Sequence, residues 1–124
     1  MSFVCPDCNK KTLNILERIE LAPDARSDEI SLQLIHCKNC NFDGLAVYEE
    51  SRRGALDSES IDHYGYKPDD EDIKVLRAFI KRCPEPTNPW CKCEGHQKLN
   101  KRNEFGRWVK PGSKTGQDTF PMDL

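Results

Sequence analysis

The sequence lacks a long apolar run. Its 124 residues contain no stretch approaching the roughly 18 apolar residues that a membrane-spanning helix needs. Residues 1–4, Met-Ser-Phe-Val, lead directly into Cys5, so we expect no secretory leader. These absences predict a cytoplasmic protein with no membrane partner. In such a reducing compartment, clustered cysteines bind metal more often than they form disulfides.

Apolar residues are also scarce overall. Hydrophobic residues make up 36% of the chain, below the globular average, and charged residues make up 32%, above it. A core this small generally needs additional stabilisation, and the seven cysteines indicate that bound metal or disulfides provide it. The chain also lacks a Gly-rich phosphate loop, a His-Glu-x-x-His motif and a Ser/His/Asp arrangement. We therefore expect a non-enzymatic protein with no small-molecule substrate.

The first candidate metal site consists of two Cys-x2-Cys pairs separated by 28 residues: Cys5, Cys8, Cys37 and Cys40. Such a pair presents two thiolates to one ion, and zinc prefers four tetrahedral ligands. Asn9 and Asn41 follow the two pairs, and asparagine tolerates the left-handed backbone that these turns often require. A redox pair or two disulfides is the alternative, but the doubled spacing favours zinc. Four thiolates can also hold iron.

The residues around these cysteines alternate as strands do. Leu13–Leu21 and Ile30–Leu34 predict two strands joined by a turn, and Phe42–Tyr48 predicts a third. In the first strand, four apolar residues are expected on one face, with Glu17 interrupting. Two cysteine pairs that bracket a hairpin resemble the zinc-ribbon (rubredoxin-like) fold group over residues 3–50. This resemblance implies a three-stranded antiparallel sheet and specifies no function.

A second candidate metal site follows the spacing Cys-x7-Cys-x-Cys-x2-His: Cys83, Cys91, Cys93 and His96. Four ligands within 14 residues suit one tetrahedral zinc, so we expect two zinc ions in the protein. An apolar stripe of helical period precedes the site and predicts a helix that ends near its first cysteine. His63 could replace the histidine as a ligand. Free thiols or a redox pair of the second and third cysteines are the alternatives.

Together these patterns predict a small zinc-stabilised α+β protein. Residues 1–50 form a zinc ribbon and residues 51–69 an acidic connector whose tyrosines cover the sheet. Residues 70–110 form one helix and an irregular second zinc unit with a basic segment. Residues 111–124, rich in Gly, Ser, Thr and Pro, form a disordered tail.

The basic segment is the main functional indication. Six of its residues could contact nucleic acid: Lys98, Lys101, Arg102, Arg107, Trp108 and Lys110. Cations neutralise phosphates and aromatic rings stack on unpaired bases, so we expect a nucleic-acid-binding protein, within a larger protein machine. The alternative is a solvated segment whose tryptophan packs onto the second zinc unit. The protein would then be a protein–protein interaction adaptor.

A further alternative comes from the expected hairpin turn. Arg26-Ser27-Asp28-Glu29 resembles the Arg-Ser-Ala-Asp-Glu motif in the zinc ribbon of eukaryotic and archaeal transcript-cleavage factors. In that family, the acidic pair enters the polymerase active site and helps hold a metal ion for RNA hydrolysis. The resemblance implies a polymerase accessory role for Asp28 and Glu29. This chain departs from the motif, because the residue between Ser27 and Asp28 is missing.

Overall fold

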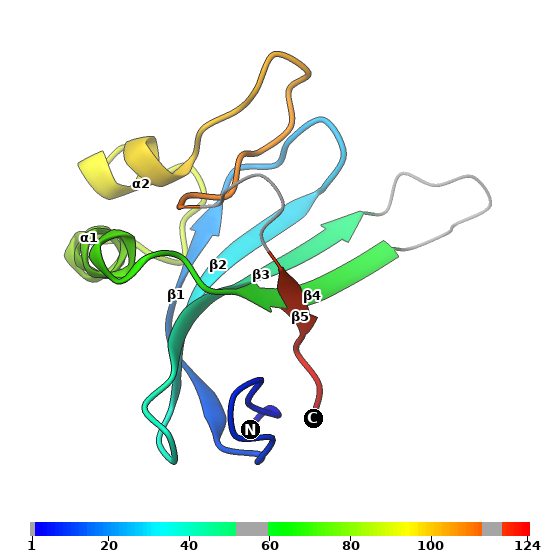
Figure 1. Cartoon of the computed structure of the whole chain (residues 1–124). Helices are drawn as coiled ribbons and strands as arrows, with labels where there is room; N and C mark the ends of the chain where they lie inside the picture. Colours follow the sequence, from blue (N-terminus) through cyan, green and yellow to red (C-terminus); the bar gives the residue numbers. More distant parts are fainter. Residues whose placement is uncertain (1, 52–59, 113–117) are drawn as a thin grey trace.

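A single antiparallel sheet organises the chain. The computed structural model describes residues 2–51, 60–112 and 118–124. The strands pair in chain order: β1 (Leu13–Leu21), β2 (Glu29–Cys37), β3 (Asp43–Ser51), β4 (Ser60–Tyr66) and β5 (Thr119–Pro121). Two helices, α1 (Asp70–Arg82) and α2 (Glu94–Leu99), lie on one side of the sheet (Figure 1). Among the described residues, no helix has the length and apolar character needed to cross a membrane.

The predicted α+β class is confirmed, but the prediction of three strands and one helix is incomplete. β4 forms within the segment expected to be a connector, and β5 forms within the expected tail. Residues 52–59 and 113–117 of these two segments lie outside the described residues. The expectation of disorder is wrong for 119–121, because these residues pair with Tyr64–Tyr66. The short helix α2 lies in the second cysteine unit, which was expected to be irregular.

The helix-facing side of the sheet carries the larger core. Alternate residues of β2 and β3 pack there against α1 and against residues from the C-terminal segment. Ile73, Leu76 and Ile80 form the buried stripe of α1. Its acidic first turn and basic last turn suit the helix dipole. Burying each of these aliphatic side chains contributes about 1.5–3 kcal/mol to folding.

A β-bulge in β1 corrects the predicted single apolar face. The β1–β2 register shifts between Ile15 and Glu17, and the intervening Leu16 is 54% exposed. One inserted residue reverses the side to which later side chains point. Ile15 therefore packs on the side opposite the helices, whereas Ile19 packs in the helix-facing core. β1 thus contributes to the cores on both sides of the sheet.

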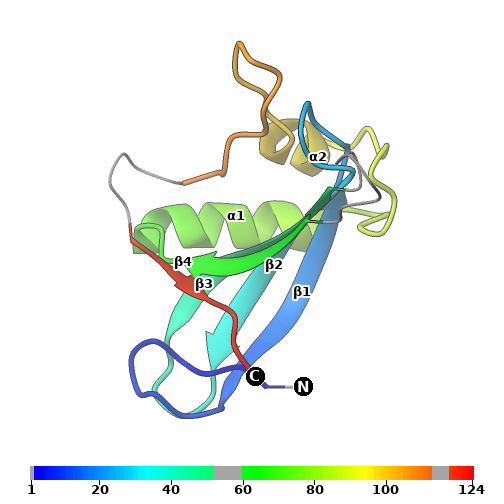
Figure 2. The ribbon, with the colours of Figure 1, turned by 90° about the vertical axis from the view of Figure 1, so that its right-hand side faces the viewer.

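The opposite side of the sheet holds a smaller core at the end where both termini lie (Figure 2). Phe3, Leu13, Ile35 and Phe42 are buried there, together with Met122 from beyond β5. The N–H of Val4 donates to the carbonyl of Asp123 at 2.8 Å, which joins the two ends of the chain. Each side of the sheet therefore has a core of its own, and each core includes one of the cysteine clusters.

Candidate metal centres

The first cluster brings together the four cysteines predicted as ligands: Cys5, Cys8, Cys37 and Cys40. Their sulfur atoms all lie within 4.8 Å of one another. One pair precedes β1, and the other starts at Cys37, the last residue of β2, so the pairing of these two strands brings the cysteines together. The Sγ atoms of Cys5 and Cys40 are 3.6 Å apart, and those of Cys8 and Cys37 are 3.7 Å apart.

These separations fit zinc. Bonds of about 2.3 Å to a tetrahedral zinc ion place two sulfurs about 3.8 Å apart, whereas a disulfide needs about 2.05 Å. The alternative of disulfide pairing therefore does not fit the geometry. Hydrogen bonds to the backbone of Lys10 and the side chain of Asn39 lower the pKa of Cys8 to about 6. A thiol with this pKa is largely ionised at neutral pH. The backbone of Phe42 lowers the pKa of Cys40, but burial and the neighbouring sulfurs raise it to about 12, so metal binding here would release a proton.

The two turns that carry these cysteines have matching backbones. Asn9 and Asn41 have φ of 60° and 63°, which confirms the predicted left-handed conformation. In each turn, the asparagine N–H donates to the carbonyl of the first cysteine of the pair at 2.9 Å. The Thr12 hydroxyl lies 3.0 Å from the Cys37 sulfur and can donate a hydrogen bond to its thiolate. Such outer contacts orient the ligands of a metal site.

The second cluster also forms as predicted, from Cys83, Cys91, Cys93 and His96. Cys83 follows α1 directly, and Cys93 is the N-cap of α2, where its sulfur accepts the N–H of His96 at 3.3 Å. The His96 Nδ1 atom lies 3.1 Å from the sulfur of Cys83 and 3.4 Å from that of Cys93. Burial would raise the pKa of Cys93, but hydrogen bonds to His96 lower it to about 7.

The structure brings His96, and not His63, to the three cysteines of the second candidate site. The Nε2 atom of His96 lies 2.9 Å from the carbonyl oxygen of Glu20. This hydrogen bond requires the proton on Nε2, which leaves Nδ1 unprotonated toward the three sulfurs. His63 instead lies on β4, where its Nε2 atom is 2.7 Å from Oε1 of Gln33.

Close contacts hold α2 against α1 and join the second cluster to β1. A side chain at Gly95 would meet the carbonyl oxygen of Phe79 at 2.7 Å, so only glycine permits this approach of α2 to α1. The Glu20 N–H donates to the carbonyl of Pro86 at 2.7 Å. The backbone of Glu20 therefore bonds both to the loop between two ligands and to the histidine ligand itself.

Four of the six residues predicted to contact nucleic acid make contacts within the chain instead. Trp108 is 6% exposed within the larger core, and its indole N–H donates to the Leu99 carbonyl at 2.8 Å. Its ring therefore has no free face on which a base could stack. The alternative expectation, that this tryptophan packs onto the second cysteine unit, agrees with the structure. Arg102 donates to the carbonyls of Ala22 and Pro23 in the β1–β2 turn.

Arg107 also contacts the β1–β2 turn. Its Nη1 atom lies 2.9 Å from the Asp24 carboxylate, which has no exposed side-chain surface. Lys110 lies over the rings of Tyr64 and Tyr66, at 4.8 and 5.6 Å from their centroids. The remaining two of the six residues, Lys98 and Lys101, are exposed.

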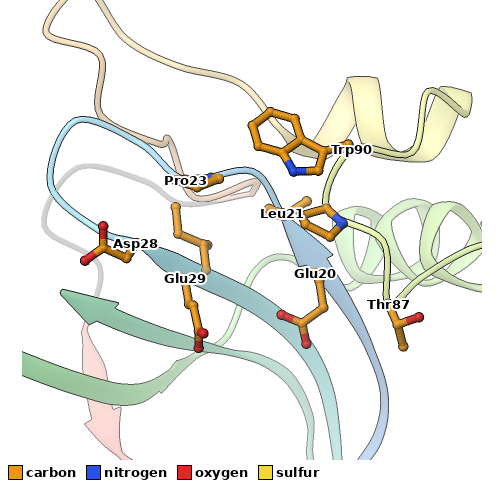
Figure 3. A pocket seen from close by; sticks show the side chains of 9 residues that line it. Glu20, Leu21, Pro23, Asp28, Glu29, Thr87 and Trp90 are labelled. Atoms are coloured by element: carbon orange, nitrogen blue, oxygen red, sulfur yellow. The ribbon is translucent and has the colours of Figure 1, made fainter. Parts of the chain in front are cut away.

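Asp28 and Glu29, the acidic pair of the hairpin, follow a turn that contacts the C-terminal segment. The N–H of Ala25 donates to the carbonyl of Gly106 at 2.9 Å, and the arginines described above hold the same turn. Asp28 and Glu29 follow the turn at the start of β2 and line a surface pocket (Figure 3). The turn that precedes Asp28 and Glu29 is therefore held against the C-terminal segment.

No family model, curated protein or solved structure matches the chain. The two clusters and the antiparallel sheet are consistent with a zinc-binding domain of the α+β class. The chain thus has two candidate metal sites that suit Zn²⁺, one with four cysteines and one with three cysteines and a histidine.

Proposed function

We propose that the chain is a non-enzymatic, zinc-stabilised module that binds another protein. Each candidate metal site has four protein ligands, which fill the coordination sphere of tetrahedral zinc. Such a site offers no open position for water or substrate, so the metals would serve the fold. Function then depends on the surface.

The observation that carries the proposal is the exposed Trp90. This indole is 68% exposed and lies beside a pocket that it shares with Pro23 and with the carboxylate-bearing residues Glu20 and Glu29. Exposed tryptophans are enriched at the energetic centres of protein interfaces. The neighbouring carboxylates disfavour nucleic acid, because they repel phosphates.

Affinity capture with the full zinc-loaded chain tests this proposal. Nuclease-treated extract of the cells that produce the protein is passed over wild type, Trp90→Ala and the control Val75→Ala. Val75 is 53% exposed on α1 and does not line the pocket. We expect a protein that binds wild type and the control, is lost with Trp90→Ala and binds again when purified. Identical captured sets for all three chains would contradict the proposal.

A second candidate function is nucleic-acid binding through a smaller surface than the sequence suggested. Lys98 and Lys101 are exposed, and Phe105 is 75% exposed. These residues provide two cations and one ring that can reach a single strand. Binding to short single-stranded RNA and DNA across salt concentrations tests this candidate. It requires affinity that falls with salt and that decreases in the Lys98→Ala, Lys101→Ala double variant.

A further inference from the structure

The pocket beside Trp90 has two chemically different ends. Its volume is about 510 Å³, and it extends between the end of the β1–β2 hairpin and the loop that precedes Cys91. Figure 3 shows Trp90 and Pro23 near one another at one end. The side chains of Glu20 and Glu29 come from neighbouring strands and point the same way at the other end. An occupant of the whole pocket would therefore need both an apolar part and a part that complements carboxylates.

The polar end is centred on Glu20. Its side chain is 29% exposed, and the nearest cation described for it is the Arg18 Nε atom, at 3.9 Å. That distance exceeds the range of a hydrogen bond, so the carboxylate retains capacity to accept one. Asp28 and Glu29 also line the pocket but have other interactions of their own. The argument for a cation therefore depends on Glu20.

The hydroxyl of Ser31 supports this carboxylate from the neighbouring strand. Ser31 lies opposite Glu20 in the β1–β2 register and is 5% exposed. Burial raises the pKa of the Glu20 carboxyl, and a hydrogen bond from the Ser31 side chain favours its ionised form. Ser31 does not line the pocket, so the Glu20 carboxylate is the group of this pair that a ligand can reach.

The apolar end suits the rest of such a ligand. Leu21, Pro23, Pro89 and Trp90 line it. The indole can cover an aliphatic side chain or the stem of a long basic one. A phosphate-bearing ligand is disfavoured at this site because its charge would face the carboxylates.

We propose that this pocket binds an extended segment of a partner protein in which a lysine or arginine is flanked by apolar residues. This inference rests on the proposed protein-binding function and specifies the chemistry of the partner. The cation would donate to Glu20, and the flanking apolar residues would contact Trp90. Both parts are needed, because exposed ion pairs alone contribute little affinity.

Peptide titration followed by NMR tests the pocket directly. The probes are blocked pentapeptides Gly-Leu-Arg-Leu-Gly and Gly-Leu-Lys-Leu-Gly, with Gly-Leu-Gln-Leu-Gly as the neutral control. The chain has two tryptophans, so two indole N–H signals report on binding. We expect a saturable shift of the Trp90 signal, whereas the signal of the buried Trp108 stays in place as an internal control. The neutral peptide should bind about tenfold more weakly, as expected for the loss of a charged hydrogen bond.

Matched variants separate this inference from a general attraction to the surface. Glu20→Gln should weaken the binding of the basic peptides about tenfold. Glu17→Gln removes the same charge from the same strand outside the pocket, and it should leave binding unchanged. Equal binding of the neutral peptide, or equal effects of the two glutamate variants, would overturn the inference.

The two proposals can fail separately. A captured protein that is lost with Trp90→Ala but retained with Glu20→Gln would support protein binding and overturn the basic-segment inference. If the basic peptides bind as expected and no protein is captured, the pocket chemistry holds and the proposed adaptor function fails.

Discussion

Replacing Asp24 by alanine removes the acceptor that joins the β1–β2 turn to the C-terminal segment. The side chain of Asp24 has no exposed surface. Its Oδ1 atom accepts the N–H groups of Arg26 at 2.9 Å and Ser27 at 2.7 Å. Its Oδ2 atom accepts the N–H of Trp108 at 2.8 Å and Nη1 of Arg107 at 2.9 Å. This one carboxylate thus accepts hydrogen bonds from four donors in two segments of the chain.

The expected loss follows from these contacts. Removing one member of a buried ion pair costs about 3–5 kcal/mol, because the other charge loses its partner. Arg107 is 30% exposed and can be partly rehydrated, so we expect about 3 kcal/mol for Asp24→Ala. Asp24→Asn keeps an oxygen for the turn and loses the charge, which predicts a smaller loss of about 1–2 kcal/mol.

The choice of pH follows from the ionisation of Asp24. Burial would raise the pKa of this carboxyl, but N–H donors from Trp108, Ser27 and Arg26, together with Arg107, hold it below 3.8. A carboxyl whose pKa is lowered on folding contributes stability at pH values above its unfolded pKa. That contribution is lost only as pH falls through the lower, folded value. Measurements at neutral pH therefore report the full contribution.

Urea unfolding at saturating zinc, followed by circular dichroism, measures the effect. The control is Asp70→Ala, because the side chain of Asp70 is 84% exposed and its pairing with Lys67 lies on the surface. The control should unfold near the wild-type midpoint. A free energy of unfolding for Asp24→Ala within about 1 kcal/mol of wild type would refute the reasoning, since a loss that small is typical of exposed sites.

Four further predictions address the metals, the packing and the pH dependence. Native mass spectrometry should find two zinc ions in wild type and one in Cys91→Ser, and a single ion in wild type would contradict the second site. Gly65→Ala should destabilise the fold by about 1–3 kcal/mol, because its methyl group would collide with the Phe120 ring; adding Phe120→Ala should cancel the collision. Trp108→Ala should cost about 3–5 kcal/mol in urea unfolding, and an unchanged midpoint would contradict its place in the core. Burial, aided by nearby acids, raises the pKa of Tyr64 from 10.0 to about 12, so the unfolded chain ionises first and stability should fall between these pH values; Tyr64→Phe should lessen that fall.

The metal clusters could be predicted because the spacing of cysteines within short segments of the sequence indicates them. A Cys-x2-Cys turn places two ligands by itself, and Asn9 and Asn41 indicate the backbone that such turns need. The spacing could not choose between His63 and His96. That choice depends on the packing of α2 against β1, where the Glu20 carbonyl orients the imidazole.

The missed features depend on contacts between distant segments. The alternation in β1 continues through the bulge, so the sequence does not show that Leu16 turns outward and reverses the later residues. β5 is too short to have a pattern of its own, and it exists because β4 offers an edge. Trp108 occurs among cations in the sequence, yet two neighbouring arginines bond to the β1–β2 turn and place its ring in the core.

The contact of Asp24 with Arg107 has a consequence for the order in which the protein matures on the ribosome. All four ligands of the first cluster are present once residue 40 has been synthesised, so that centre can form early. The Asp24 carboxylate can bond to Arg107 only after a further 83 residues have been synthesised. During that interval the Asp24 carboxylate has no partner arginine, and the helix-facing core lacks Trp108. The nascent chain is therefore expected to present an unfinished apolar surface to chaperones until its last quarter emerges.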